Sequence, residues 1–444
     1  MKVKKTIQAL LLIVGLSAQP ISAGELQALY SKALQNDPQY STAVSVREAA
    51  QEFMPMARAG FFPRIGIGAS YGRNDTERDA PIILNIRKKI DYEFYPENYS
   101  LTLTQPLLRP AIVAEYNQAR WRTEQAEADF GQRTDELKQR LAEAYLRTLV
   151  SSARMKLIDQ QKVTFEALLR QAERSYASGY GTVTEVAESQ SRLDELLSEQ
   201  VTAKALNENQ LAVLRQIIGM PNYTIAAVDF KDFAPTLHGE LSLAEWKEVA
   251  RLNSPELRAE SARVKGAGSN VEKALAAFSP TLDLRLQYSK DKDSGYSNEG
   301  VILTSRSAVL SFNFPVFEGG YTVSQYRQST SQLTAAQENL RAVTEGLDVD
   351  IEKEYGNVVS LVVRIQALQR SVQTNELLVK ATAKSVDAGV RSNVDLLNAQ
   401  SRLFEAKLKL SESRISYLLS LVRLKIFAGV FADSDFAVLD GALF

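Results

Sequence analysis

The stretches FFPRIGIGASY at residues 61–71 and FSPTLDLRLQY at residues 278–288 decide the fold, because in each a proline leads into apolar side chains at alternate positions. Such alternation is typical of a β-strand with one apolar face. The two stretches are offset by 217 residues (278 − 61), and the same offset relates Asn36 and Pro38 to Asn253 and Pro255. The chain therefore carries one segment twice.

The duplication continues through most of the chain, with an offset of 210 residues in the later part of each copy. Gly179 matches Gly389, the sequence QSRL at 190–193 recurs at 400–403, and Gly219 matches Gly429. A repeat this long predicts two structural repeats built from the same elements. We divide the chain into a first repeat at 24–220, a linker at 221–240 expected to form a belt around the middle of the molecule, a second repeat at 241–430 and a short C-terminal tail at 431–444.

Four strands are predicted, at about 61–73, 97–106, 279–290 and 305–315. Each is close to the length of roughly 10 residues that a membrane strand needs. The charged segments 73–97 and 290–305 are expected to be loops. A soluble hairpin with one face on a core would show the same alternation. If the strands face lipid, four of them cannot close a barrel, because unpaired edge groups are costly there, so several copies of the chain must share one barrel.

Two long segments, 111–178 and 321–388, contain no proline and predict helices on the order of 100 Å long. In the second of them Leu333, Leu340 and Leu347 recur every seven residues, which is typical of helices that pack side by side as coiled coils. Each long helix ends near a glycine, Gly179 or Gly389, and a new helix is predicted a few residues later. The sequence therefore predicts two helical hairpins, with tips at the far end from the strands.

The amino terminus reads as a signal peptide at 1–23, with a basic start, a short apolar run and Ala23 before Gly24. The exported chain is then expected to start at Gly24. It has no cysteine, which excludes disulfides and thiol catalysis, and His238 is its only histidine. A net charge of −1 gives no electrostatic case for a nucleic-acid partner. We find no catalytic constellation and no cofactor or metal motif, so the chain is not expected to be an enzyme.

Three motifs resemble the TolC family of outer-membrane channel-tunnels, the outer membrane efflux proteins. They are FSPTLDL at 278–284, SFNFPVFEGG at 311–320 and the segment from Gly389 to Ala399. The resemblance implies a mostly α protein with a membrane β-barrel. Four strands from each protomer would share a twelve-stranded barrel in a homotrimer. A coiled-coil α-helical tunnel would extend from the cell outer membrane into the periplasm.

The resemblance also implies the partners of the chain. Family members are exit ducts in outer-membrane lipid that dock, through a periplasmic adaptor, onto an inner-membrane ABC transporter or an RND pump. The short tail and the lack of a lipid-bearing cysteine look most like the channels of type I secretion, which export proteins such as proteases. Two alternatives stay open, namely the outer-membrane component of a multidrug efflux pump and a soluble periplasmic coiled-coil adaptor.

The family pattern assigns roles to the second hairpin tip. Its two acidic positions around the pore fall on Asp395 and Asn398, so half of the acidic constriction is absent here. The tip latch, a basic residue that reaches a neighbouring hairpin, falls on Arg391, with Thr184 and Glu185 as partners. A tyrosine that supports this latch is replaced by Val386. The alternative for Arg391, Asp395 and Glu185 is ordinary helix capping and surface charge.

Overall fold

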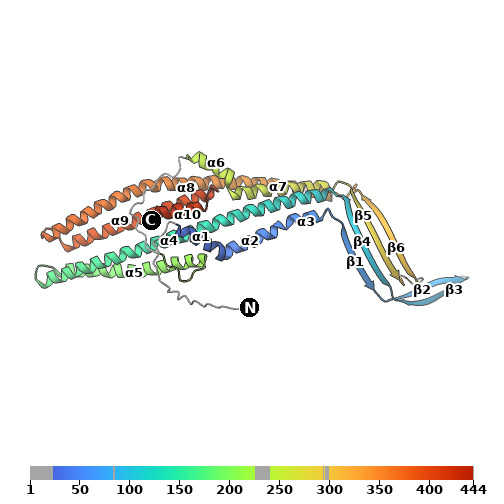
Figure 1. The fold of residues 1–444 in the computed structure, drawn as a ribbon, viewed down its shortest axis with the longest axis horizontal. Helices are drawn as coiled ribbons and strands as arrows, with labels where there is room; N and C mark the ends of the chain where they lie inside the picture. Colours follow the sequence, from blue (N-terminus) through green and yellow to red (C-terminus); the bar gives the residue numbers. More distant parts are fainter. Residues whose placement is uncertain (1–23, 84–85, 226–240, 294, 296–299, 444) are drawn as a thin grey trace, which may run out of the picture.

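The structure is a computed structural model that describes residues 24–83, 86–225, 241–293, 295 and 300–443. The expected signal peptide at 1–23 lies outside the described residues, as do residues 226–240 of the expected belt, including His238. The molecule is elongated, with long helices along its length and a β-sheet at one end (Figure 1). The mostly helical fold class is confirmed.

Ten helices and six strands are assigned among the described residues. The helices are α1 (Glu25–Asn36), α2 (Pro38–Gln51), α3 (Phe53–Ala59), α4 (Pro110–Ala177), α5 (Val183–Ile218), α6 (Leu243–Asn253), α7 (Pro255–Ala276), α8 (Tyr321–Asp387), α9 (Asn393–Phe427) and α10 (Ser434–Leu443). The strands are β1 (Arg64–Tyr71), β2 (Asn74–Ile83), β3 (Ile86–Phe94), β4 (Glu97–Leu108), β5 (Thr281–Lys292) and β6 (Ile302–Asn313). Proline occupies the first position of α2, α4 and α7, where its missing N–H leaves no hydrogen bond unmade.

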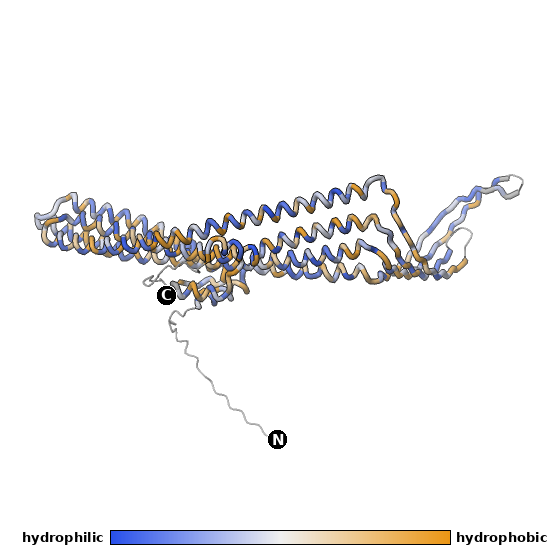
Figure 2. The backbone as a smooth tube through the Cα atoms, turned by 90° about the horizontal axis from the view of Figure 1, so that it is seen from above, coloured by the Kyte–Doolittle hydropathy of each residue, from blue (hydrophilic) through white to orange (hydrophobic). Residues whose placement is uncertain are grey.

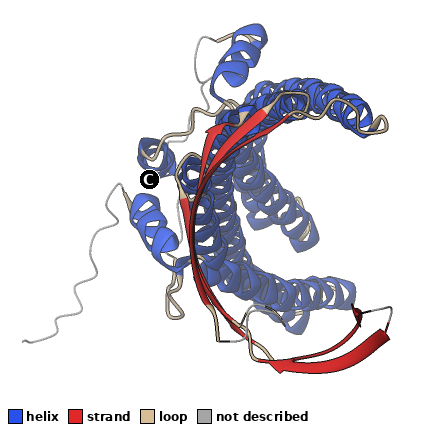
Figure 3. Cartoon of the chain, turned by 90° about the vertical axis from the view of Figure 1, so that its right-hand side faces the viewer, coloured by secondary structure: helices blue, strands red, loops and turns tan. Residues whose placement is uncertain are grey.

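The main sheet is antiparallel, with strand order β1-β4-β5-β6, and it curves in an arc (Figure 3). Its register pairs Ile67 with Leu101, Leu101 with Tyr288, and Leu284 with Leu310. Because directly paired residues point to the same face of a sheet, the apolar positions of all four strands form one continuous face. Within the described chain, β1 and β6 each have a neighbour on one side only, so the sheet has two open edges.

The expectation that 73–97 is a loop was wrong. Strands β2 and β3 form a separate antiparallel hairpin in which Asp79 is paired with Lys89. Cross-strand salt bridges support it, from Arg87 to Asp79 at 3.3 Å and from Lys89 to Glu77 at 2.5 Å. The hairpin continues beyond the main sheet and is largely hydrophilic (Figure 2). On β3 the apolar residues Ile90, Tyr92 and Phe94 alternate with exposed charged ones, and Phe94 is buried, so the ion pairs add to a short apolar face.

The long helices α4 and α8 run from the sheet to the opposite end of the molecule, and α5 and α9 return from there to the middle (Figure 1). On α8, Leu347 of the series that starts at Leu333 is buried, and so are Val358 and Ile365, which are seven residues apart on a neighbouring row. Glu354, seven residues after Leu347, is also buried, and its carboxylate accepts a hydrogen bond from the Asn357 amide at 3.2 Å. Hydrophobic and hydrophilic positions are interspersed along the whole length of these helices (Figure 2).

The returning helices α5 and α9 stop at glycines that lie against the start of another helix. Gly219 and Gly429 have positive φ angles of 69° and 67°, a conformation that favours glycine. A Cβ atom on Gly429 would lie 2.6 Å from the carbonyl carbon of Asn253, just before α7. A Cβ on Gly219 would lie 2.6 Å from Cγ of Asn36, just before α2. The end of α5 therefore lies against the end of α1, and the end of α9 lies against the end of α6.

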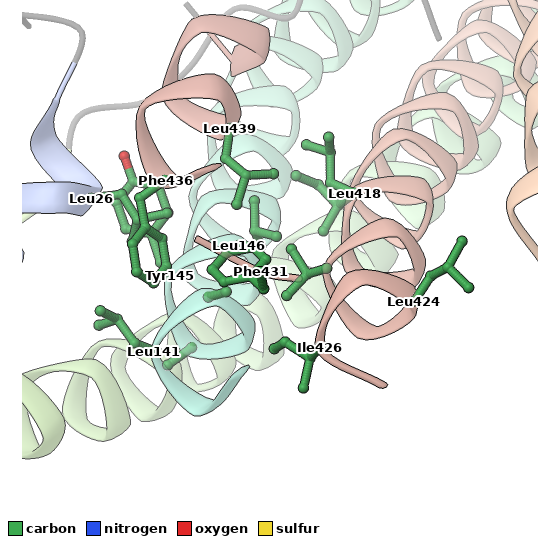
Figure 4. Packing of buried hydrophobic residues seen from close by; sticks show 14 of the residues in the cluster. Leu26, Leu141, Tyr145, Leu146, Leu418, Leu424, Ile426, Phe431, Phe436 and Leu439 are labelled. Carbon is green, nitrogen blue, oxygen red and sulfur yellow. The ribbon is translucent and has the colours of Figure 1, made fainter. Parts of the chain in front are cut away.

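The segment 431–444 was expected to be a short tail, yet the structure places the helix α10 there. Phe431, Phe436 and Leu439 are buried against α1 and the middle of α4 (Figure 4). The rings of Tyr30 and Phe436 lie 5.0 Å apart. The apolar side chains of this segment thus complete the main hydrophobic core rather than face solvent.

Candidate functional site at the two hairpin tips

The two hairpin tips lie together at the end of the molecule opposite the strands (Figure 1). One tip connects α4 to α5, and the other connects α8 to α9. Arg391, Asp395 and Asn398 all belong to the second tip or the first turns of α9, and Thr184 and Glu185 belong to the first turn of α5. The structure thus brings the predicted gate and latch residues to one end of the molecule.

Both tips have the same backbone turn. Gly179 and Gly389 have φ angles of 77° and 73°, which end the long helices. The carbonyl of Ser175 accepts hydrogen bonds from the backbone N–H of the two residues that follow Gly179. The carbonyl of Ser385 does the same for the two residues that follow Gly389. The two turns therefore have the same geometry at positions that the offset of 210 residues relates.

Each returning helix starts with a capping box. In α5 the hydroxyl of Thr182 accepts from the N–H of Glu185, whose carboxylate accepts from the N–H of Thr182. In α9 Ser392 and Asp395 make the same pair of bonds, at 3.2 and 3.1 Å. These contacts satisfy N–H groups that a helix start would leave unpaired. Glu185 and Asp395 are thus equivalent residues that cap their own helices, as the alternative interpretation predicts.

The Asp395 carboxylate is exposed and ionised. The backbone N–H and the hydroxyl of Ser392 donate to it, and Arg391 adds a smaller attraction, so the pKa of Asp395 is lower than usual. Capping and a role in a pore are compatible, since a capping carboxylate keeps its negative charge. Asn398, one turn further along α9, is half-buried and carries an amide, so it adds no charge.

The latch contact is not made within one protomer. Among the described residues, Arg391 forms no salt bridge with a carboxylate of its own chain, and its side chain is exposed. The Thr184 hydroxyl lies 2.9 Å from that of Thr182, within the first turn of α5. The latch contact predicted for Arg391 is therefore not seen within the protomer.

Close to the tips, the two hairpins of the protomer contact each other through apolar side chains. Leu397 of α9 is buried in a cluster with Phe165 of α4 and Leu193 and Leu196 of α5. Leu396 and Phe404 pack against the same cluster. Because Leu397 lies between Asp395 and Asn398, this cluster fixes the orientation of the first turns of α9.

Two exposed apolar residues at the tips were missed in the sequence. Tyr180 is 94% exposed and Val390 is 78% exposed, at equivalent positions directly after the two turn glycines. A single apolar residue on a surface is ordinary, but a matched pair at the tips is suited to contact another protein. The offset of 210 residues, applied to each position in turn, would have singled them out. It also relates Val386 to Tyr176, so the first tip has a tyrosine where the second has valine.

In the part of the chain that the structure describes, none of the helices combines the length and the apolar character that crossing a membrane requires.

Comparison with known proteins identifies relatives along almost the whole chain. Alkaline protease secretion protein AprF of Pseudomonas aeruginosa is 28% identical over 417 residues, covering 91% of this chain and 84% of that protein. Proteases secretion protein PrtF of Dickeya chrysanthemi is 27% identical over 444 residues, covering 96% of this chain and 93% of that protein. Outer membrane protein TolC of Escherichia coli is 26% identical over 454 residues, covering 97% of this chain and 88% of that protein.

Solved structures show the same fold. The outer-membrane channel OprN superposes with a TM-score of 0.79 at 17% identity, over 91% of this chain and 90% of that one. The CmeC outer membrane channel of Campylobacter jejuni gives 0.77 at 16% identity, over 98% and 95%. The sequence profile described as outer membrane efflux protein matches residues 29–220 and 246–430. The chain therefore belongs to the outer membrane efflux protein family, which confirms the resemblance found in its sequence.

Proposed function

We propose that this chain forms the outer-membrane channel-tunnel of a tripartite export system and is the exit duct for type I secretion of a protein such as a protease. One observation carries the proposal. The sheet, which has one continuous apolar face and two open edges, lies at one end of the elongated molecule, and the two charged hairpin tips lie at the other end. A sheet of this kind is suited to lipid, and the tips are suited to a pore mouth.

The open edges also support a homotrimer. Four strands from each of three protomers would give twelve, with β1 of one copy pairing with β6 of the next. The arc seen in Figure 3 agrees with one third of a closed wall. The two repeats, at 24–220 and 241–430, would each supply two strands and one hairpin. The long helices would then form the periplasmic tunnel, and the cell outer membrane would hold the sheet.

Type I secretion is favoured over drug efflux because AprF and PrtF, similar over nearly the whole chain, are both named as protease secretion proteins. The partners we propose are a periplasmic adaptor, which would contact the exposed Tyr180 and Val390, and an inner-membrane ABC transporter. An RND pump would take the place of the transporter if the chain served multidrug efflux. Neither role requires a cofactor, a catalytic residue or nucleic acid.

A secretion assay tests the proposed cargo. The chain is expressed, with the transporter and adaptor of a protease secretion system, in a bacterium that lacks its own channel. We expect protease in the medium only when the chain is present. Protease retained in cells whose outer membrane contains the chain would contradict the assignment. Restored drug resistance in those cells would favour the efflux alternative.

We predict that Asp395→Asn lowers the cation selectivity of the pore and weakens its block by multivalent cations. Three carboxylates around a narrow mouth concentrate cations, so we expect block to weaken by about tenfold. The amide keeps an oxygen that can still cap α9, so the change removes charge with little effect on the helix. Selectivity and block are measured in a planar lipid bilayer.

Ser392→Ala is the matched control for Asp395→Asn, because it removes the capping hydroxyl and keeps the carboxylate. We expect it to leave the selectivity unchanged. Equal selectivity in the wild type and Asp395→Asn would rule out Asp395 as the constriction.

We predict that Arg391→Ala increases the conductance of the closed channel. If Arg391 pairs with Thr184 or Glu185 of a neighbouring hairpin, its loss shifts the balance toward open tips by roughly threefold for each exposed pair. Lys384→Ala, at another exposed cation in the last turn of α8, is expected to leave the conductance unchanged. If the wild type, Arg391→Ala and Lys384→Ala have the same closed-channel conductance, Arg391 does not act as a latch.

A further inference from the structure

A buried carboxylate near the carboxyl end of the chain lies against the start of its first helix. Asp440 of α10 is 0% exposed. Its Oδ2 atom accepts hydrogen bonds from the backbone nitrogens of Gly24 at 3.2 Å and Leu26 at 2.9 Å. Its Oδ1 atom is buried and has no hydrogen-bond partner among the described residues. One half of this carboxylate is therefore satisfied, and the other half lacks a donor.

The packing around Asp440 holds it in place and excludes water. Leu26 of α1 and Phe436 of α10 are both 0% exposed and lie next to Tyr145 of α4 (Figure 4). Leu439, next to Asp440 in the chain, is buried in the same cluster. The orientation of the carboxylate toward Gly24 is thus set by the core and not by a mobile surface.

The site has negative charge without a matching cation. The Glu25 carboxylate accepts hydrogen bonds from the phenols of Tyr223 and Tyr145, whose pKa values are raised by burial, so both stay protonated. Burial, with Glu25 nearby, raises the pKa of Asp440 to about 6. In the described part of the chain, the hydrogen-bond partners of Asp440 and Glu25 are backbone N–H groups and phenols, and neither carboxylate pairs with a lysine or arginine. An uncompensated buried carboxylate is unfavourable, so a cation close to Asp440 would stabilise this site.

We propose that Asp440 binds the α-ammonium group that removal of the signal peptide creates at Gly24. A leader peptidase hydrolyses the bond between Ala23 and Gly24 with one water molecule, and the new carboxylate of Ala23 leaves with the leader. The nitrogen of Gly24 takes up a proton and becomes an ammonium group with three N–H donors. It already lies 3.2 Å from Oδ2 and can supply the donor that Oδ1 lacks.

The pair joins the two ends of the exported chain. In the unprocessed chain the Gly24 nitrogen is a neutral amide, and Asp440 and Glu25 remain without a cation. Processing adds a positive charge at the contact between α1 and α10, so the ion pair at this contact forms only after export. The inference rests on the leader expected at 1–23 and on this contact, and it is independent of the cargo.

The reactivity of the terminal amine tests the proposal. The protein is purified from outer membranes, its mass is measured to establish that it starts at Gly24, and it is treated at pH 7 with an amine-acylating reagent. The acylated amino-terminal peptide is quantified by mass spectrometry. We expect the amine of Asp440→Asn to react at least about tenfold faster than that of the wild type, since a salt bridge that raises the amine pKa by one unit removes that much free amine.

Two further variants keep the test independent of folding defects. Insertion of one glycine between Ala23 and Gly24 moves the ammonium by about 3.8 Å and leaves Asp440 intact, and it is expected to raise the reactivity as well. Asp433→Asn, at a carboxylate that pairs with Lys138 at 3.1 Å just before α10, is expected to leave it unchanged. The proposal is overturned if the purified chain starts at a residue other than Gly24. It is also overturned if the wild-type amine reacts as fast as the amine of Asp440→Asn and that of the glycine insertion.

Discussion

Leu101→Lys is expected to prevent stable insertion of the protein into the outer membrane. Leu101 lies in the middle of β4, on the continuous apolar face, and is 45% exposed in the protomer. A lysine that faces lipid near the bilayer midplane costs about 2–4 kcal/mol, and the proposed trimer would carry three copies, so the total would be roughly 6–12 kcal/mol. The amount of chain in washed outer membranes is expected to fall to background.

Thr102→Lys is the matched control, because Thr102 is the next residue of β4 and points to the opposite face of the sheet. A lysine on the face toward a water-filled lumen is tolerated, so we expect normal insertion and an altered ion selectivity. Equal insertion of the two variants would mean that the apolar face does not meet lipid. If Leu101→Lys inserts and Thr102→Lys does not, the face that carries Thr102 meets lipid and the face that carries Leu101 meets the lumen.

Gly429→Ala is expected to cause the largest loss of stability among the substitutions in the helical part. The residue has a φ angle of 67°, which costs an L-residue roughly 1–2 kcal/mol. Its new Cβ would also overlap the Asn253 carbonyl, with the carbonyl carbon at 2.6 Å, and such overpacking costs about 1–3 kcal/mol. We expect a clearly lower midpoint of thermal unfolding, measured by circular dichroism in detergent.

Gly346→Ala provides the control for this change. Gly346 lies within α8, and a Cβ there would have no neighbour within 4 Å. Alanine favours a helix over glycine by roughly 1 kcal/mol, so the variant should be as stable as the wild type or slightly more stable. If Gly429→Ala unfolds at the wild-type temperature, the approach of Gly429 to Asn253 at the end of α6 is not as close as the structure has it.

The helices and the main sheet could be predicted because their signals are local. The alternation in 61–71 and the seven-residue spacing after Leu333 each indicate one type of element from adjacent residues. The hairpin of β2 and β3 was missed because the segment is dominated by charged residues, which hide the short alternation of Ile90, Tyr92 and Phe94 and form ion pairs across the two strands. Helix α10 was missed because its apolar residues are buried by α1, about 400 residues earlier in the chain.

The candidate site could be predicted only in part. The spacing of Ser392 and Asp395 already favours a capping box, and the structure has one. The offset of 210 residues relates Gly219 to Gly429, but it cannot show that Gly429 touches Asn253, because that contact depends on how two helices meet in space. The latch at Arg391 stays a prediction, since its partner would come from another chain.

Single-channel recording of the purified, detergent-extracted protein in a planar lipid bilayer tests the central claim most directly. An exit duct with an acidic constriction at Asp395 predicts small openings that are selective for cations. A protein that stays in solution without detergent and never inserts would contradict the channel and favour a soluble periplasmic rod.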